Sequence, residues 1–169
     1  AFQNCATVTK ITMPDSVTKI ESYAFYNCAE LAEIELSTAL EDIEENAFRD
    51  CVKLESIELP AGLKTIGNSA FRNCDGVKGG LAIPSSVTAI GEYAFAYSTG
   101  FDGKLTIEAN DGLTIGIYAF YETTFNAVEI GDGTLSIGNY AFYNCSSISG
   151  DLVIPDSVTS IGNYAFYRC

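Results

Sequence analysis

Six cysteines are the side chains best able to carry chemistry in this sequence, because thiols act as nucleophiles, metal ligands or disulfide partners. Each follows the phenylalanine of an Ala-Phe dipeptide by three residues. They are Cys5, Cys28, Cys51, Cys74, Cys145 and Cys169, and Ser98 and Thr123 fill the same slot in two further copies. A slot that accepts Cys, Ser or Thr predicts a core position for a small, weakly polar side chain, so we expect buried, reduced thiols. A disulfide between stacked neighbours is the alternative.

A pair of carboxylates could support a second kind of chemistry. Glu35 and Glu58 occupy equivalent outward positions of neighbouring predicted strands, which would hold them about 5 Å apart. That spacing resembles the carboxylate pair of a retaining glycosidase. Any strand ladder produces it, so we favour a solvated acidic strip. The chain has no histidine, which excludes Ser-His-Asp and Cys-His catalysis and leaves too few ligands for zinc. We therefore expect no catalytic residue, no cofactor and no metal site.

An internal repeat positions these residues. The Ala-Phe dipeptide recurs every 22–25 residues, within the roughly 20–29 residues typical of leucine-rich repeats. Its phenylalanines are Phe2, Phe25, Phe48, Phe71, Phe95, Phe120, Phe142 and Phe166. An isoleucine stands five residues before seven of them, and glycine follows it in five copies. These glycines are Gly67, Gly91, Gly116, Gly138 and Gly162. Because one copy cannot bury its own apolar side, stacked copies must share a continuous core.

Each repeat predicts three local structures. An alternating apolar pair, from Ile11-x-Met13 to Leu152-x-Ile154, predicts a short strand with both side chains on one face. The segment Ser-Val-Thr-x-Ile-Gly is expected to turn the chain back, with glycine fitting a tight bend or a close approach. Tyr-Ala-Phe-x-x-Cys predicts a short helical or 3₁₀ turn. Tyrosines recur beside Ala-Phe, and we interpret these stripes as ladder packing on the convex side rather than as a binding surface.

The residues that alternate with the apolar pair point away from the core and form our candidate partner-binding strip. Its members are Lys10, Thr12, Glu33, Glu35, Ser56, Glu58, Lys104, Thr106 and Glu129. The early repeats are strongly acidic, which could attract a basic partner or weakly hold calcium through oxygen ligands. A solvated face that only maintains solubility is the simpler interpretation of the charge.

The charge balance limits the partners. Twenty-two acidic and nine basic residues give a formal net charge of −13. Nucleic acids and anionic lipids need a basic patch, so we expect neither as a partner. The sequence has no run of about 18 apolar residues, so it predicts no transmembrane segment.

Two segments carry a family resemblance. Residues 154–169 read Ile-Pro-Asp-Ser-Val-Thr-Ser-Ile-Gly-Asn-Tyr-Ala-Phe-Tyr-Arg-Cys, and residues 83–95 read Ile-Pro-Ser-Ser-Val-Thr-Ala-Ile-Gly-Glu-Tyr-Ala-Phe. Both closely resemble the BspA-like leucine-rich repeat family, and the similarity extends over essentially the whole chain. The resemblance implies a curved right-handed solenoid with a parallel sheet on its concave side. It also implies a surface or secreted protein linked to adhesion to host proteins and to other cells.

We therefore expect residues 1–169 to form a single leucine-rich repeat solenoid of about seven repeats, part of a longer array. The leading functional hypothesis is an extracellular or cell-surface binding and adhesion module whose partner is a protein, such as a host extracellular or cell-surface protein. This hypothesis rests on analogy, because fold does not dictate function. The alternatives are a carbohydrate-binding or glycan-processing solenoid, and a structural stalk.

Overall fold

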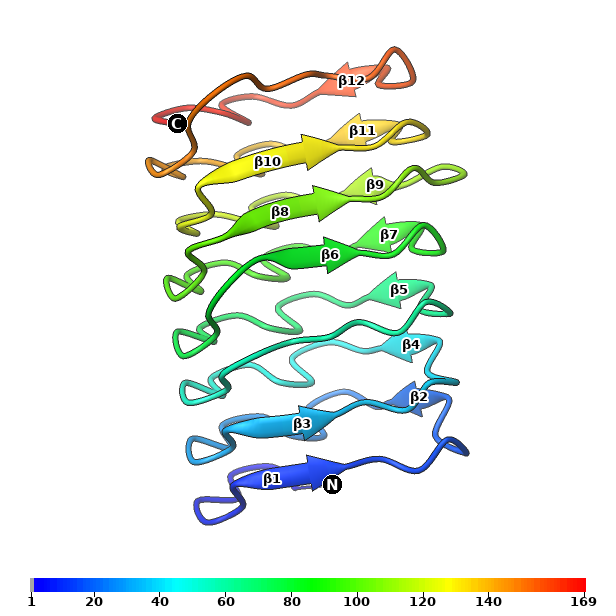
Figure 1. Cartoon of the computed structure of the whole chain (residues 1–169), viewed down its shortest axis with the longest axis vertical. Helices are drawn as coiled ribbons and strands as arrows, with labels where there is room; N and C mark the ends of the chain where they lie inside the picture. Colours follow the sequence, from blue (N-terminus) through cyan, green and yellow to red (C-terminus); the bar gives the residue numbers. More distant parts are fainter. Residues whose placement is uncertain (1) are drawn as a thin grey trace.

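The chain stacks coil upon coil along one long axis, and each coil has a front and a rear side (Figure 1). The structure is a computed structural model that describes residues 2–169. The front strands are β1 (Lys10–Thr12), β3 (Glu33–Glu35), β6 (Leu81–Ile83), β8 (Lys104–Ile107) and β10 (Ala127–Ile130). They form two parallel sheets, β1-β3 and β6-β8-β10. The predicted leucine-rich repeat solenoid is confirmed.

The rear side carries a parallel sheet that the sequence did not predict, because its segments were interpreted as turns. The rear strands are β2 (Lys19–Ile20), β4 (Asp42–Ile43), β5 (Thr65–Ile66), β7 (Ala89–Ile90), β9 (Thr114–Ile115), β11 (Ser136–Ile137) and β12 (Ser160–Ile161). They form one seven-stranded sheet in chain order. Each isoleucine pairs with the isoleucine of the next coil, as Ile90 does with Ile115. The repeated isoleucine therefore marks a second ladder as well as a core position.

The glycine after this isoleucine serves a close approach rather than a tight bend. The amide of Gly116 donates to the carbonyl of Ile90 at 2.8 Å, which draws the two coils together. Glu21 and Glu44 hold the glycine position in two coils at the N-terminal end. There the Glu44 carboxylate accepts hydrogen bonds from the amide and the hydroxyl of Ser22, each at 3.0 Å.

The Ala-Phe phenylalanines form one column through the core. Neighbouring rings stack with centroids 5.0–5.4 Å apart, from Phe2 to Phe166. Phe48, Phe95 and Phe120 are fully buried, and the alanines beside them are buried too. Stacking at this distance adds to the free energy gained by burying the rings. The column confirms that the dipeptide sets the register of the coils.

The corner around Ala-Phe is built from successive turns, and the predicted helical or 3₁₀ turns are wrong. Within residues 2–169 the structure has no helix. Tyr23 and Asn27 adopt left-handed conformations, with φ of 59° and 55°, and equivalent residues do so in every following coil. Such residues prevent a helix from propagating. Every second amide of the corner also donates to the next coil instead of to its own; the amide of Phe25, for example, donates to the carbonyl of Ala47 at 2.8 Å.

The front ladder is interrupted in the third coil. Residues 55–59, which contain the predicted pair Ile57 and Leu59, form no strand, and neither do residues 151–154 near the C-terminal end. At Glu55 the backbone still makes two hydrogen bonds to neighbouring coils. Its amide donates to the carbonyl of Ala32 at 2.9 Å, and its carbonyl accepts from the amide of Lys78 at 3.0 Å. Ile57 remains buried, so the side-chain pattern persists where the backbone pairing does not.

Candidate functional site

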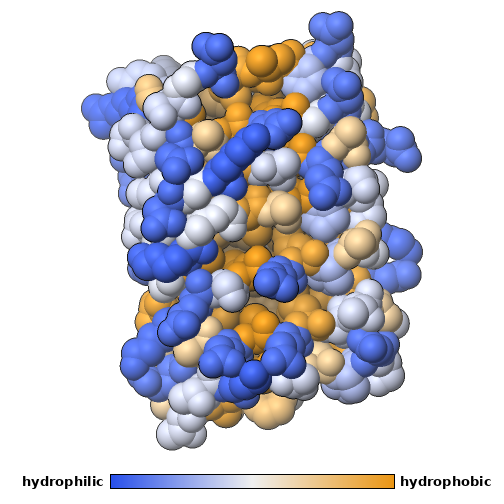
Figure 2. All heavy atoms as spheres, in the orientation of Figure 1, coloured by the Kyte–Doolittle hydropathy of each residue, from blue (hydrophilic) through white to orange (hydrophobic). Residues whose placement is uncertain are grey.

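The front strip consists of the nine outward side chains predicted from the sequence. Alternation along the strands is as expected: in β8, Leu105 and Ile107 are buried, Lys104 is exposed and Thr106 is half-buried. The other members of the strip are exposed, including Ser56 and Glu58 in the interrupted segment. Figure 2 shows an apolar band down the middle of this face with hydrophilic side chains on both sides.

The strip holds an ion-paired cluster at its N-terminal end. Lys10 Nζ lies 3.0 Å from Glu33 Oε2 and 2.9 Å from Glu35 Oε1. Hydrogen bonding to Glu35 and then to Glu33 raises the pKa of Lys10. Hydrogen bonds from Lys10 and then Thr12 lower the pKa of Glu35. The side chains are at least half exposed, so the pairs contribute little to stability and are easily exchanged for contacts with a partner.

A second ion pair joins Lys104 of β8 to Glu129 of β10. Glu129 lies in register with Thr106, so these three side chains come together. Between the two clusters the outward positions of the fourth coil are Gly80 and Ala82, whose small size leaves a hollow of about 370 Å³.

Glu58 and Glu108 line this hollow, and the Glu108 carboxylate accepts a hydrogen bond from the amide of Ser85 at 3.0 Å. Glu108 is not among the nine residues predicted for the strip. The signal that could have found the hollow is two consecutive outward positions without a long side chain.

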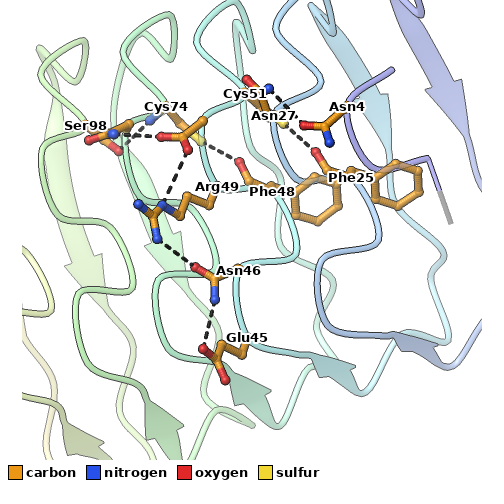
Figure 3. Close-up of polar contacts among 12 residues, drawn as sticks. Asn4, Phe25, Asn27, Glu45, Asn46, Phe48, Arg49, Cys51, Cys74 and Ser98 are labelled. Atoms are coloured by element: carbon orange, nitrogen blue, oxygen red, sulfur yellow. Dashed lines mark hydrogen bonds and ion pairs between the residues drawn. The ribbon is translucent and has the colours of Figure 1, made fainter. Parts of the chain in front are cut away.

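The cysteines occupy one column, in which the four in the middle are buried as predicted, whereas Cys5 is half-buried and Cys169 is exposed at the two ends of the stack. Cys51 Sγ donates to the carbonyl of Phe25 at 3.2 Å and Cys74 Sγ donates to that of Phe48 at 3.3 Å (Figure 3). Ser98 Oγ makes the equivalent bond to the carbonyl of Phe71 at 2.8 Å. Thr123 instead donates to the carbonyl of Phe120 in its own coil at 2.9 Å. The slot therefore selects a small donor that satisfies a buried carbonyl, and within residues 2–169 all six thiols are free.

A sequence model of the BspA-type leucine-rich repeat region matches the chain in six copies, over residues 1–102 and 113–169. The chain belongs to this family. A search of curated proteins finds no match.

Solved structures of bacterial leucine-rich repeat proteins are similar to this BspA-type chain. A leucine-rich repeat protein of T. pallidum is 26% identical with a TM-score of 0.71, over 96% of this chain and 64% of the other. One from Bacteroides ovatus is 25% identical with a TM-score of 0.59, over 100% of this chain and 66% of the other. One from Eubacterium ventriosum shares the fold at 22% identity and a TM-score of 0.77, over 96% and 43% of the two chains. This BspA-type chain thus spans less than two thirds of the length of each.

The glycosidase interpretation of Glu35 and Glu58 finds no geometric support. The ladder that would hold the two carboxylates at strand spacing is interrupted at residues 55–59. Lys10 pairs with Glu35 and lowers its pKa, which argues against Glu35 as the general acid of such a pair. Within residues 2–169, no group of three or more His, Cys, Asp or Glu side chains is arranged to hold a metal ion. Over the same residues, no helix is long and apolar enough to cross a membrane.

The buried thiols should resist alkylation. Burial raises the pKa of Cys51 to about 12 and of Cys145 to about 11, and raises that of Cys74 well above its usual value. Since the thiolate is the reactive species, iodoacetamide at about pH 8 should label exposed Cys169 and leave these three unmodified. Mass spectrometry of the labelled peptides measures this, and a urea-unfolded sample should label at every cysteine. Rapid labelling of Cys74 in the folded protein would contradict the prediction.

Proposed function

We propose that this chain is an extracellular or cell-surface adhesion module that binds a protein partner through its front strip. The supporting observation is the strip itself: the front strands and the segment 55–59 hold a row of exposed polar side chains over a buried apolar core. Such a surface loses little conformational freedom when a partner binds. The surface location rests on the family resemblance, which links members to attachment to host proteins and other cells. We also propose that residues 1–169 act as one solenoid domain.

The charge of the strip favours a basic partner surface. The strip has six ionisable side chains, of which four are acidic: Lys10, Glu33, Glu35, Glu58, Lys104 and Glu129. The net charge of −13 adds a long-range attraction for positive surfaces. Charged residues of this kind mainly raise the association rate and fix the orientation of the complex. Binding should therefore weaken as salt increases.

The test compares the intact chain with a variant whose front strip is neutralised. The wild-type chain is immobilised, and collagen, laminin, fibronectin and whole epithelial cells are the probes. We expect at least one probe to bind. Glu33→Gln, Glu35→Gln and Glu58→Gln together should weaken that binding about tenfold, mainly through a slower association rate. Thermal unfolding should change little, because these carboxylates are exposed.

A matched control removes the same charge elsewhere. Asp111→Asn, Asp132→Asn and Asp156→Asn neutralise three exposed carboxylates in the loops that follow the front segments. This control should retain wild-type affinity. Absence of binding to every probe, or an equal loss in both triple variants, would refute the proposal. Glycan-array binding that disappears with Glu35→Gln or Glu58→Gln would replace the protein partner with a carbohydrate.

A further inference from the structure

All ten tyrosines and all three arginines lie directly before or just after an Ala-Phe dipeptide, on the corner of the coil. This corner belongs to the segment that runs behind the front strands in Figure 1. We use the term tyrosine face for two neighbouring columns on it. One column contains Tyr93, Tyr118 and Tyr140, and the other contains Tyr97, Tyr121 and Tyr143. This surface is separate from the front strip.

The rings of the tyrosine face form an ordered array. Tyr93 and Tyr118 stack with centroids 4.7 Å apart, and Tyr118 and Tyr140 at 4.8 Å. Between columns the rings meet edge to face, as Tyr118 and Tyr121 do at 74°. All six side chains remain partly exposed. Within the columns only Tyr97 and Tyr121 meet edge to face, at 67°, and the other neighbours stack, so the surface presents mainly ring edges and phenol groups.

Arg72 lies against this array without a counter-charge. Its Cζ is 5.2 Å from the ring centroid of Tyr93 and 5.0 Å from that of Tyr97. Its Nε is buried without a hydrogen-bond partner, as is that of Arg49, but Arg72, unlike Arg49, forms no ion pair with any of residues 2–169. The side chain as a whole stays partly exposed, so a ligand can reach it.

The preceding coil shows what Arg72 lacks. Arg49 occupies the same position one coil earlier, and its Nε lies 3.4 Å from Asp50 Oδ2 while its Nη1 donates to Asn46 Oδ1 at 3.4 Å (Figure 3). In the next coil the equivalents of Asp50 and Asn46 are Asn73 and Ser69. The carboxylate that neutralises Arg49 is therefore missing beside Arg72. A partly desolvated guanidinium between two rings is a strong site for an external carboxylate.

The chemistry of the face favours a protein ligand over a carbohydrate. Sugars stack on open aromatic faces, and here most of those faces are covered by neighbouring rings. A polyanionic chain would be repelled by the net charge of −13, whereas one carboxylate among apolar side chains would not. Tyrosine and arginine are also the residues enriched at the energetic centres of protein interfaces. We propose that the tyrosine face docks a protein segment that places one Asp or Glu carboxylate on Arg72 and apolar side chains along the tyrosine columns.

The test uses short random peptides displayed on phage and selected on the intact chain. Enriched peptides are synthesised in two forms, one with the acidic residue and one with its amide counterpart. We expect the acidic form to bind the wild-type chain about tenfold more tightly, as a bidentate carboxylate–guanidinium pair predicts. Arg72→Gln should reduce affinity for the acidic form by the same factor and leave the amide form unchanged. The comparison of the two peptides on the wild-type chain stands even where Arg72→Gln alters folding.

Arg49→Gln is the matched control, because it removes an arginine from the same column without touching the rings around Arg72. Both variants are checked by thermal unfolding, and Arg49→Gln should bind both peptides as the wild type does. The triple front-strip variant should also keep full peptide affinity, because peptide docking on the tyrosine face does not depend on partner binding by the front strip. Selected peptides without an acidic residue, equal affinity of the acidic and amide forms, or Arg72-dependent binding confined to a glycan array would overturn it.

Discussion

Replacing Phe95 by alanine is expected to lower the free energy of unfolding by about 3–5 kcal/mol. Phe95 is fully buried and stacks between Phe71 and Phe120, with both centroid distances 5.3 Å. The substitution removes two ring contacts and leaves a cavity that the neighbouring coils cannot fill, because backbone hydrogen bonds fix their spacing. Urea unfolding followed by circular dichroism measures the loss.

Phe2→Ala is the control for position in the column. Phe2 is 51% exposed and stacks on Phe25 alone, so its truncation should cost much less than that of Phe95. Equal costs at the two positions would mean that the column does not hold the coils together.

Gly116→Ala should destabilise the protein by about 1–3 kcal/mol through overpacking. A Cβ at this position would lie 2.6 Å from the carbonyl carbon of Gly91 and 2.7 Å from the carbonyl oxygen of Ile90. Both atoms belong to the backbone of the preceding coil, so relief requires the rear ladder to open. Thermal unfolding together with amide hydrogen exchange at Ile115 would report both effects.

Gly62→Ala provides the matched comparison. Its added Cβ would have the carbonyl oxygen of Leu40 as its nearest neighbour, at 4.0 Å. Alanine there should be neutral or stabilise by up to about 1 kcal/mol, because it restricts the unfolded chain. If Gly116→Ala were tolerated as well as Gly62→Ala, the close approach of the rear strands would not matter for stability.

The sequence predicted what depends on side-chain burial. The Ala-Phe repeat located the phenylalanine column, and the shared Cys, Ser and Thr slot located the inner donors that bond the phenylalanine carbonyls. Alternation placed all nine members of the front strip outside the core. Each of these features repeats once per coil, so any error in one copy is corrected by the others.

The sequence failed where backbone pairing decides the structure. A two-residue strand such as β7 is too short to show alternation, so the rear ladder was interpreted as a turn. The corner was predicted as helical because its left-handed residues, such as Tyr93 with φ of 55°, are not glycines. The interruption at residues 55–59 was equally invisible, since Ile57 keeps its buried position there.

For the candidate surfaces, position was predictable and pairing was not. The reach of Lys10 to both Glu33 and Glu35 depends on the spacing of coils and on side-chain rotamers. Arg72 shows the limit more clearly, because the tyrosine stripes were interpreted as packing. Its missing counter-charge becomes visible only when Asn73 is compared with Asp50 at the same place one coil earlier.

The interruption of the front ladder also has a mechanical consequence. Hydrogen bonds between coils run along the stack, so a pulling force on that axis stretches the front, rear and corner bonds of each boundary together. β8 and β10 share this tension along four paired residues, whereas the segment at 55–59 offers only isolated bonds at its start. A chain pulled along this axis would therefore yield first at the two interruptions of the front ladder, around residues 55–59 and 151–154, and the coils between them would separate as an intact block.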